Sequence, residues 1–467
     1  MTENSRNPLH AFADWASSTP QKWSDLAISR AYNAVVDTVA VMVPGAREQV
    51  TLTVFKLARG WGAGDCDVVG YRDGLSAPMA ALVNGTAAHA LDYDDNFDPA
   101  KAHASAVLVP ALLAIANERD STGAELLDAY IVGLQIMGLV GQGVNPYHRS
   151  RGWHATSTVG AVGAAAGCAR LLKLPPGETA HAISLATSMA GGFMSQFGTM
   201  TKPLHAGLAA AGAVQAAQFA EAGVTAGSQT LHGEKGMGTL MVGPDVEALR
   251  LEMTNKDEYG QKVHFRTENI GNPLLIEKYG LKVKQFPNCG SAHRALDGLL
   301  ELKATHNIEP DTVEKILVRA PAAHLRNLMY SRPTNGLEAK FSLEYSLAAG
   351  LLHGKVSLQD YDDNSVEKPG ITAILPLIEK DYVEKLESDF PTQVHVFLKS
   401  GKKLSTEVAM PKGSGTNPLS SAEQWNKFDH CVTAHLPGKV RGSIKNALEA
   451  LQKDAPVNNL THQLAYP

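Results

Sequence analysis

The sequence is poor in cysteine and in aromatic residues. Its 467 residues include only four cysteines, at positions 66, 168, 289 and 431. They lie far apart and form no CxxC pair, so a zinc or iron–sulfur site is not expected, and a reducing compartment is the simplest interpretation. Aromatic residues make up 6% of the chain, whereas alanine and glycine are abundant. This composition favours closely packed helices with small residues at their contacts.

An excess of positive charge is also missing. The net charge is −5, with both signs mixed along the chain, so no basic patch argues for a nucleic-acid partner. The first six residues lack the apolar core of a signal peptide. No apolar run reaches the ~18 residues that a membrane span needs. The sequence therefore predicts a soluble, cytoplasmic protein with no membrane partner.

The length predicts two domains, because 467 residues are too many for one hydrophobic core. Residues 1 to about 265 read as a succession of helices. Ser76 is a candidate N-cap, and Thr122 with Glu125 has the spacing of a capping box. The expected helices span 77–90, 124–140, 155–172 and 206–222.

The character of the sequence changes near residue 265. Strands are expected at 313–318, 393–399 and 403–410, and helices at 291–305, 338–353, 372–380 and 440–452. The pattern predicts a mainly α protein with a smaller α+β domain. Residues 1–268 and 411–467 would form an all-helical domain, and residues 269–410 an α+β lid domain. We expect the active site in the cleft between them.

An acidic segment stands between two helical stretches rich in alanine and leucine. It holds four aspartates, a lysine and a histidine, which are Asp92, Asp94, Asp95, Asp98, Lys101 and His103. Buried charges must be paired or hydrogen-bonded, so the segment suits a site that binds polar groups or moves protons. A calcium loop is excluded, because the glycine and the distal glutamate of an EF-hand are missing. The alternative is that Asp94 and Asp95 only cap the next helix.

Basic residues stand in short segments near buried helices. His154 lies close to a predicted helix N-terminus, where the helix dipole lowers a histidine pKa. Lys202 and His205 are expected in a turn before another helix, where a lysine suits an anion. Lys284 opens the second domain, and Tyr330 with Arg332 lies in one of its loops.

Each of these residues also has a structural interpretation. A lone histidine near a helix start is more often a satisfied structural residue. Lys284 could be a surface lysine, and Tyr330 a core aromatic residue with a bonded hydroxyl. Cys289 is better explained as a small buried hydrophobic residue than as a nucleophile. Several basic groups together, each next to a small-residue helix, favour the functional interpretation.

Four motifs together resemble the MmgE/PrpD family, which includes 2-methylcitrate dehydratase, cis-aconitate decarboxylase and iminodisuccinate epimerase. The motifs are Asn84-Gly85-Thr86-Ala87-Ala88-His89-Ala90-Leu91-Asp92-Tyr93-Asp94-Asp95, Lys202-Pro203-Leu204-His205-Ala206-Gly207, Lys284-Gln285-Phe286-Pro287 and Glu338-Ala339-Lys340-Phe341-Ser342. The resemblance covers nearly the whole chain. It implies a large helical domain with a smaller lid, a homodimer, and no metal or organic cofactor.

The resemblance also implies which residues act. The catalytic residues would be Asp92, His103, His154 and Lys202. The residues that bind a small polycarboxylate substrate would be Asn96, His205, Lys284, Tyr330 and Arg332.

The chain departs from the family pattern at three places. Asn96 stands where the dehydratases and decarboxylases usually have threonine, Ala104 follows His103 in place of proline, and Cys289 replaces a histidine of the decarboxylases. These differences resemble the iminodisuccinate epimerase branch better. The resemblance therefore implies a cofactor-independent isomerase, an epimerase of iminodisuccinate that abstracts and returns a proton at the carbon α to a carboxylate.

Several alternatives stay open. A 2-methylcitrate dehydratase or a cis-aconitate decarboxylase-type lyase would use the same carbon-acid chemistry, and a non-catalytic metabolite-binding protein would keep the fold alone. For an epimerase, an acid and a base on opposite faces of the carbon are required. His154 with Lys202, or His103 with His154, would supply them, with Asp92 orienting His103 or Lys202.

Overall fold

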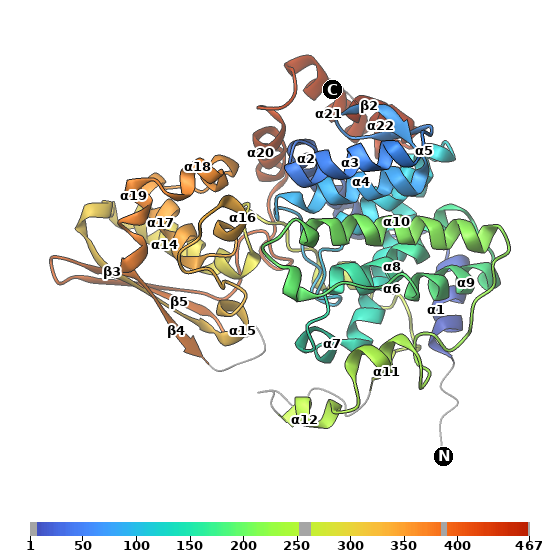
Figure 1. The fold of residues 1–467 in the computed structure, drawn as a ribbon, viewed down its shortest axis with the longest axis horizontal. Coiled ribbons are helices and arrows are strands. Elements are labelled where there is room, and N and C mark those ends of the chain that lie inside the picture. Colours follow the sequence, from blue (N-terminus) through green and yellow to red (C-terminus); the bar gives the residue numbers. More distant parts are fainter. Residues whose placement is uncertain (1–6, 252–262, 384–389, 466–467) are drawn as a thin grey trace. The chain divides into compact units, whose positions relative to one another are not determined.

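The computed structural model describes residues 7–251, 263–383 and 390–465. It divides into two compact units, of which unit 1 combines Met1–Glu247, Gly260–Val283 and Ser420–Pro467, and unit 2 combines Ala248–Tyr259 and Lys284–Leu419. Unit 1 is mainly helical and unit 2 is α+β (Figure 1). The predicted fold class is therefore confirmed.

Unit 1 is built from helices of very different lengths. Those of the first part of the chain are α1 (Pro8–Ser18), α2 (Asp25–Gly45), α3 (Gln49–Trp61), α4 (Ala77–Ala90), α5 (Ser105–Glu118), α6 (Gly123–Val144), α7 (Tyr147–Ser150), α8 (Ala155–Leu171), α9 (Pro176–Thr187), η1 (Met194–Gln196), α10 (Thr201–Glu221), α11 (Met237–Val242) and α13 (Leu275–Tyr279). The last part of the chain adds α20 (Ser421–Val432), α21 (Gly438–Leu451) and α22 (Asn458–Leu464). The short helix α12 (Val246–Leu251) lies where unit 1 gives way to unit 2 along the chain.

The predicted starts of α4 and α6 agree with the structure, whereas α10 begins at Thr201, before the expected start at 206, and the helix expected at 338–353 is divided into α16 (Gly336–Ala339) and α17 (Leu343–His353). Helix α4 begins directly after Ser76, although the Ser76 side chain makes no capping hydrogen bond. The capping box of Thr122 and Glu125 is present at the start of α6. A short hairpin of β1 (Cys66–Val68) and β2 (Tyr71–Leu75) interrupts the helices. The sequence analysis missed this hairpin because each strand is too short to show a period.

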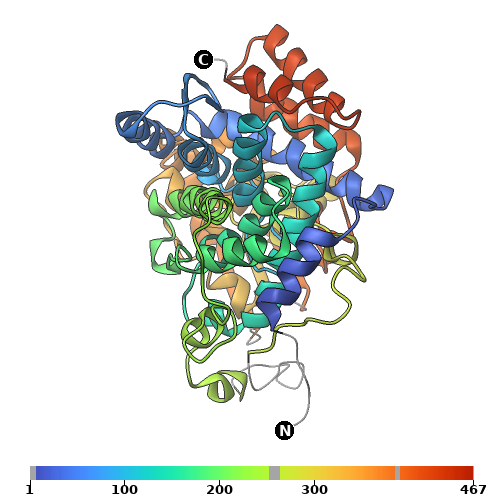
Figure 2. The same ribbon diagram turned by 90° about the vertical axis from the view of Figure 1, so that its right-hand side faces the viewer.

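The two ends of unit 1 meet in space. The C-terminal helices pack with early segments of the chain, α20 with α2, and α22 with α5 and β1 (Figure 2). Lys427 on α20 makes this contact specific, because its ammonium lies 2.6 Å from a carboxylate oxygen of Asp37 on α2. The same ammonium donates a 2.9 Å hydrogen bond to the carbonyl of Tyr93. The C-terminal helices therefore help to hold the acidic segment in place.

Helices α4 and α10 lie side by side with unusually close backbones (Figures 1 and 2). A Cβ atom built on Gly85 would lie 2.9 Å from the Cα atom of Gly207. A Cβ atom built on Gly207 would lie 2.3 Å from the carbonyl oxygen of Leu82. Only glycine fits such a crossing. The contact brings the last turn of α4 next to the first turn of α10.

Two helices of unit 1 correct the expectation that no stretch is long and apolar enough to cross a membrane. Among the described residues, α2 and α6 pass that test by length and composition. However, 72% of the apolar window in α2 and 89% of that in α6 is buried inside the protein. Core helices of soluble proteins pass the same test, so α2 and α6 are explained by packing.

Unit 2 contains a four-stranded mixed sheet in the order β4-β3-β5-β6. Its strands are β3 (Val313–Pro321), β4 (Ile378–Val383), β5 (Thr392–Leu398) and β6 (Lys403–Val408). Strands β3 and β4 are parallel, and the other two pairs are antiparallel. Along β5, Val394 and Val396 are fully buried while His395 faces outward, so one face of the sheet is covered.

Helices cover the buried face of this sheet. Gly298 on α14 (His293–His306) faces the side chains of Val394 and Thr406, and α17 (Leu343–His353) packs on α14. The remaining helices are η3 (Gly290–Ala292), η4 (Pro310–Thr312), α15 (Ala322–Leu325), α16 (Gly336–Ala339), η5 (Leu358–Tyr361), α18 (Asp363–Val366), α19 (Pro369–Thr372) and η6 (Leu375–Leu377). The helix predicted at 372–380 is wrong, since this stretch ends in β4. The parallel partner β3 stabilises Ile378–Val383 as a strand, which local sequence does not reveal.

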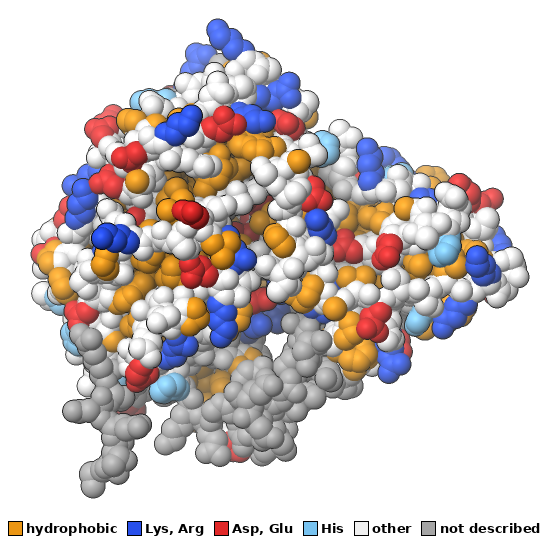
Figure 3. All heavy atoms as spheres, turned by 180° about the vertical axis from the view of Figure 1, so that it is seen from behind, with side chains coloured by type: hydrophobic (Ala, Val, Ile, Leu, Met, Phe, Trp, Pro, Cys, Tyr) orange, Lys and Arg blue, Asp and Glu red, His pale blue; other side chains and the backbone are white. Residues whose placement is uncertain are grey.

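The surface agrees with the mixed charge of the sequence. On the face shown in Figure 3, lysine and arginine side chains are interspersed with aspartate and glutamate. No extended region of one sign is visible among the described residues of that face. This distribution gives no support to a nucleic-acid partner.

Replacing Gly207 tests the close crossing of α4 and α10. Gly207→Ala would push a methyl group into the backbone of α4, and we expect it to lower the free energy of unfolding by about 1–3 kcal/mol. Gly442→Ala in α21 is the matched control, because no atom lies within 4 Å of its added Cβ. This control should raise stability by up to about 1 kcal/mol. Thermal unfolding measures whether each replacement lowers or raises the stability. An unchanged melting temperature for Gly207→Ala would contradict the packing argument.

Candidate active site

The end of α4 places the first acidic residue. The helix ends at Ala90, and Asp92 follows with a φ angle of 51°. Residues other than glycine rarely adopt this left-handed conformation, although aspartate does so more readily than most. An aspartate at a helix end where glycine is usual indicates that its carboxylate is needed there.

Asp92 pairs with Lys202 inside unit 1. Both side chains are buried, and the Lys202 ammonium donates to Asp92 Oδ1. A buried charge requires such a partner. Lys202 Nζ also lies 5.4 Å from the centre of the Phe197 ring, which favours the cation. The sequence analysis expected Lys202 and His205 in a turn, but both lie inside α10, which begins at Thr201.

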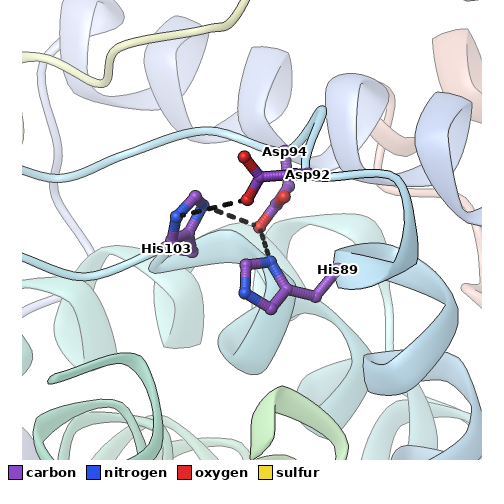
Figure 4. Close-up of side chains that lie close together, drawn as sticks. All are labelled: His89, Asp92, Asp94 and His103. Carbon is purple, nitrogen blue, oxygen red and sulfur yellow. Dashed lines mark hydrogen bonds and ion pairs between the residues drawn. The ribbon is translucent and has the colours of Figure 1, made fainter. Parts of the chain in front are cut away.

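Asp94 lies between two histidines (Figure 4). Its Oδ2 is 2.8 Å from Nδ1 of His89, on the last turn of α4, and 3.1 Å from Nδ1 of His103, just before α5. The other nitrogen of His103, Nε2, lies 3.9 Å from Asp92 Oδ1. The side chains of His89 and Asp94 are fully buried, whereas that of His103 is 14% exposed. His103 is therefore the member of this group that a ligand reaches most easily.

Burial and mutual contact set the charges of this group. Burial opposes the ionised form of Asp94, but the adjacent His89 and His103 outweigh it and hold the pKa of the carboxyl well below its usual range. Burial, supported by the nearby charge of Lys202, lowers the pKa of His89 to about 3 against the opposing effect of Asp94. At neutral pH, Asp94 is a carboxylate and His89 is a neutral donor.

A second histidine pair lies beside the first. His154 is the N-cap residue of α8, and its Nδ1 is 3.0 Å from Nδ1 of His205 on α10. The His154 and His89 rings are stacked with centroids 5.9 Å apart. Burial holds the pKa of His154 well below its ordinary value, and the charge of Lys202 acts in the same direction. The direction of this pKa shift is the one expected from the sequence, and burial is its largest cause.

The remaining predicted residues lie elsewhere. Asn96 is half-buried, and its backbone pairs with that of Lys282. Lys284, Tyr330 and Arg332 belong to unit 2. Lys284 is buried there, the backbone of Tyr330 donates to the carbonyl of Phe341, and Arg332 is exposed. The structure thus groups Asp92, His103, His154, Lys202 and His205 within unit 1.

Two members of the cluster were given no role by sequence reasoning. His89 was only part of a motif, and Asp94 was weighed as a helix cap. The position that contacts α5 is Asp95, whose carboxylate accepts from both the backbone and the hydroxyl of Ser105. The signal for His89 was its place three residues before Asp92, because this puts it on the last turn of α4, the helix that precedes Asp92.

Four side chains of the cluster have the donor atoms of a metal site. Those of His89, Asp92, Asp94 and His103 offer ligand atoms within 4.8 Å of one another (Figure 4), and imidazole with carboxylate suits several divalent metals. However, the Lys202 ammonium already neutralises Asp92, and Asp94 is shared by two histidine rings. These contacts fit an internally balanced proton-transfer cluster better than a cation site.

Comparisons with known proteins agree with this arrangement. Residues 10–249 match the MmgE/PrpD N-terminal domain, and residues 286–453 match the MmgE/PrpD C-terminal domain. The chain belongs to the MmgE/PrpD family. The cluster lies within the N-terminal match, and Lys284 lies just before the C-terminal match.

Similar curated proteins are cis-aconitate decarboxylases. The human enzyme is 26% identical over 87% of this chain and 83% of its own length. The mouse enzyme is 25% identical over 95% of this chain and 90% of its own length. That of Aspergillus terreus is 24% identical over 85% of this chain and 84% of its own length. All three are lyases, so these similarities give no support to the isomerase that the sequence analysis favoured.

Asp95 provides a pH-dependent test of the buried acidic segment. Burial raises the pKa of Asp95 to about 7, the Ser105 hydrogen bonds oppose this rise, and the charges of Asp37 and Asp94 add to it. A folded-state pKa above the unfolded value of about 3.9 means that the folded protein holds this proton more tightly. Its contribution to stability is therefore present at low pH and is lost as pH rises towards 7.

Asp95→Asn removes this ionisation and keeps the shape of the side chain. Relative to the original protein, the variant should gain stability between pH 5 and pH 8, by at most about 3 kcal/mol. Melting temperatures at both pH values measure the change, and Asp429→Asn on the exposed side of α20 controls for the loss of one negative charge. An equal effect of Asp95→Asn at the two pH values would contradict the raised pKa.

Proposed function

We propose that this protein is a cofactor-independent lyase that acts on a small polycarboxylate, with decarboxylation of cis-aconitate as the first candidate reaction. The observation that carries the proposal is the buried cluster in which Lys202, Asp92 and His103 adjoin. The activity of the similar decarboxylases supports the choice of reaction.

The proposed reaction needs one proton and a place for negative charge. Loss of carbon dioxide from cis-aconitate leaves an electron pair that the adjacent double bond passes to the carbon next to another carboxylate. That carbon takes up a proton, so that a dicarboxylate and carbon dioxide are the products. In the transition state the charge spreads onto the carboxylate oxygens, where fixed cationic donors lower its energy.

The geometry suggests separate roles for the cluster. The Lys202 ammonium is the fixed cation, and its pairing with Asp92 keeps it in place before the substrate arrives. His103 is the preferred proton-transfer group, because it is the more exposed histidine and its Nε2 faces Asp92. His154 is neutral at working pH for the reason given above, so it serves as a hydrogen-bond partner or a base rather than as an acid.

The other predicted residues complete the proposal. We assign Asn96 and His205 of unit 1, and Lys284, Tyr330 and Arg332 of unit 2, to binding of the substrate's carboxylates. Three of these side chains are cationic or can become so, as recognition of a polycarboxylate requires. This assignment rests on the family motifs.

Epimerisation of iminodisuccinate is the second candidate. It is favoured by Asn96 and Cys289, which depart from the decarboxylase pattern, and by the presence of two distinct groups, His103 and Lys202, next to Asp92. An epimerase needs such a pair to remove a proton from one face of a carbon and return it to the other. A dehydratase acting on 2-methylcitrate would use the same groups, with the acid directed at a leaving hydroxyl.

A substrate panel in heavy water separates these reactions. The purified protein, treated with a chelator because no metal is expected to be needed, is incubated with cis-aconitate, iminodisuccinate or 2-methylcitrate and followed by proton NMR. We expect cis-aconitate to lose carbon dioxide and the product to carry deuterium next to a carboxylate. Deuterium in iminodisuccinate with a change of diastereomer would identify an epimerase instead. Binding of these compounds without turnover would identify a metabolite-binding protein.

Variants of the cluster test the assigned roles. Lys202→Met and His154→Ala should each lower kcat by at least about 100-fold, the usual scale for removing an acid, a base or a charge-stabilising group. Lys202→Met alone leaves Asp92 buried without its cation, which destabilises the fold. The double variant Asp92→Asn, Lys202→Met removes both charges and should fold while remaining inactive. Activity near that of the original protein in both His154→Ala and the double variant would exclude these groups from the mechanism.

A further inference from the structure

We infer that Asp94, supported by His89, is a positioning residue that keeps the ring proton of His103 on Nδ1 and leaves Nε2 to exchange a proton with the substrate. The inference deepens the proposed function, on which its kinetic consequence rests. The predicted tautomer of His103 depends only on contacts within unit 1.

The two nitrogens of the His103 ring have different neighbours. Nδ1 lies 3.1 Å from Asp94 Oδ2, while Nε2 lies 3.9 Å from Asp92 Oδ1, whose partner is Lys202. The Asp94 side chain is fully buried, so no substrate competes for it, whereas the His103 side chain is 14% exposed. The two ring nitrogens therefore have different surroundings: Nδ1 faces the buried carboxylate of Asp94, and Nε2 lies on the side of Asp92 and Lys202.

The carboxylate of Asp94 decides which nitrogen of a neutral His103 carries the proton. A carboxylate only accepts hydrogen bonds, so a neutral imidazole with Nδ1 next to it carries its proton on that nitrogen. The lone pair is then on Nε2. For decarboxylation, Nε2 first takes a proton from solvent, and the resulting imidazolium gives that proton to the substrate carbon, while Asp94 keeps the ring in the same orientation.

His89 supports Asp94 as the other member of the cluster's first pair of histidines. It donates from Nδ1 to the same Asp94 oxygen at 2.8 Å and is fully buried. The His89 and His103 rings lie with centroids 4.4 Å apart. The hydrogen bond from His89 restricts the rotation of the carboxylate. The same oxygen lies 3.1 Å from His103 Nδ1, so His89 holds Asp94 in the orientation that His103 needs. Capping of α5 does not require Asp94, because Asp95 makes that contact with Ser105.

A direct measurement of the tautomer tests the inference without any substrate. The protein is labelled with 15N-histidine, and the His103 signals are assigned by their loss in His103→Gln. We expect neutral His103 to carry its proton on Nδ1. A His103 ring that carries the proton on Nε2 in the unaltered protein would overturn the inference, whatever reaction the protein catalyses.

Two replacements of Asp94 test its role. Asp94→Leu removes the acceptor, so His103 should lose its preference for the Nδ1–H tautomer, and kcat should fall by at least about 100-fold with little change in KM. Asp94→Asn retains an oxygen that can accept from both rings and should keep more of the tautomer and of kcat. Asp95→Asn is the matched control one residue away and should leave the His103 tautomer unchanged. A His103 tautomer that stays the same in Asp94→Leu would overturn the inference.

His89 provides a second route if Asp94→Leu does not fold. His89→Phe keeps a ring but removes the donor, and we expect a smaller loss of kcat and a less uniform His103 tautomer. His89→Asn restores an N–H donor near the position of Nδ1 and should recover part of both. Equal effects of His89→Phe and His89→Asn would contradict a role through Asp94.

The experiments distinguish failure of the proposed function from failure of the positioning role of Asp94. If none of the three candidate substrates reacts while His103 shows the Nδ1–H tautomer, the proposed function fails and the positioning of His103 stands. If cis-aconitate is decarboxylated but His103 carries its proton on Nε2, the function stands and the positioning role fails.

Discussion

The burial of carboxylates after α4 is the constraint on which the rest of unit 1 depends. A carboxylate that leaves water must be paired, hydrogen-bonded or protonated, and this segment uses all three solutions. Asp92 has the ammonium of Lys202, and Asp94 has two histidine rings. Asp95 has two Ser105 donors and no cationic partner among the described residues, and burial raises its pKa to about 7.

These partners come from distant parts of the chain, so the helices that carry them must meet. The glycine crossing of Gly85 and Gly207 brings the end of α4 to the start of α10, which carries Lys202 and His205. On another side of the segment, Lys427 of α20 binds both Asp37 and the carbonyl of Tyr93. Small residues at helix contacts, which the composition suggested, therefore serve the site as well as the core.

The resulting cluster is suited to moving one proton close to a fixed positive charge. This requirement is common to decarboxylation, dehydration and epimerisation of polycarboxylates, since each places charge on a carbon next to a carboxylate. The cluster accounts for the shared step, whereas the choice among the reactions depends on how a substrate is held and on which side the proton arrives. One fold can therefore support several reactions, and the proposed lyase activity rests on the similar decarboxylases as well as on the cluster.

Local patterns in the sequence were sufficient for the fold class and for the starts of α4 and α6. Recognisable motifs also pointed to Asp92, His103, His154, Lys202 and His205, which the structure groups within unit 1. These features depend on neighbours in the chain or on recognisable motifs. Strand β4 was mistaken for part of a helix, because its stabilising partner β3 lies far away in the sequence.

The sequence by itself thus determined which chemical groups this protein brings to its acidic segment. Only the tertiary structure decided their partners: Lys202 with Asp92, and His89 with His103 on Asp94. The physical reason is that pairing and burial are set by helix contacts between distant residues, such as Asp92 and Lys202, which are 110 positions apart. The same contacts set the pKa of each buried group, which its place in the sequence does not determine.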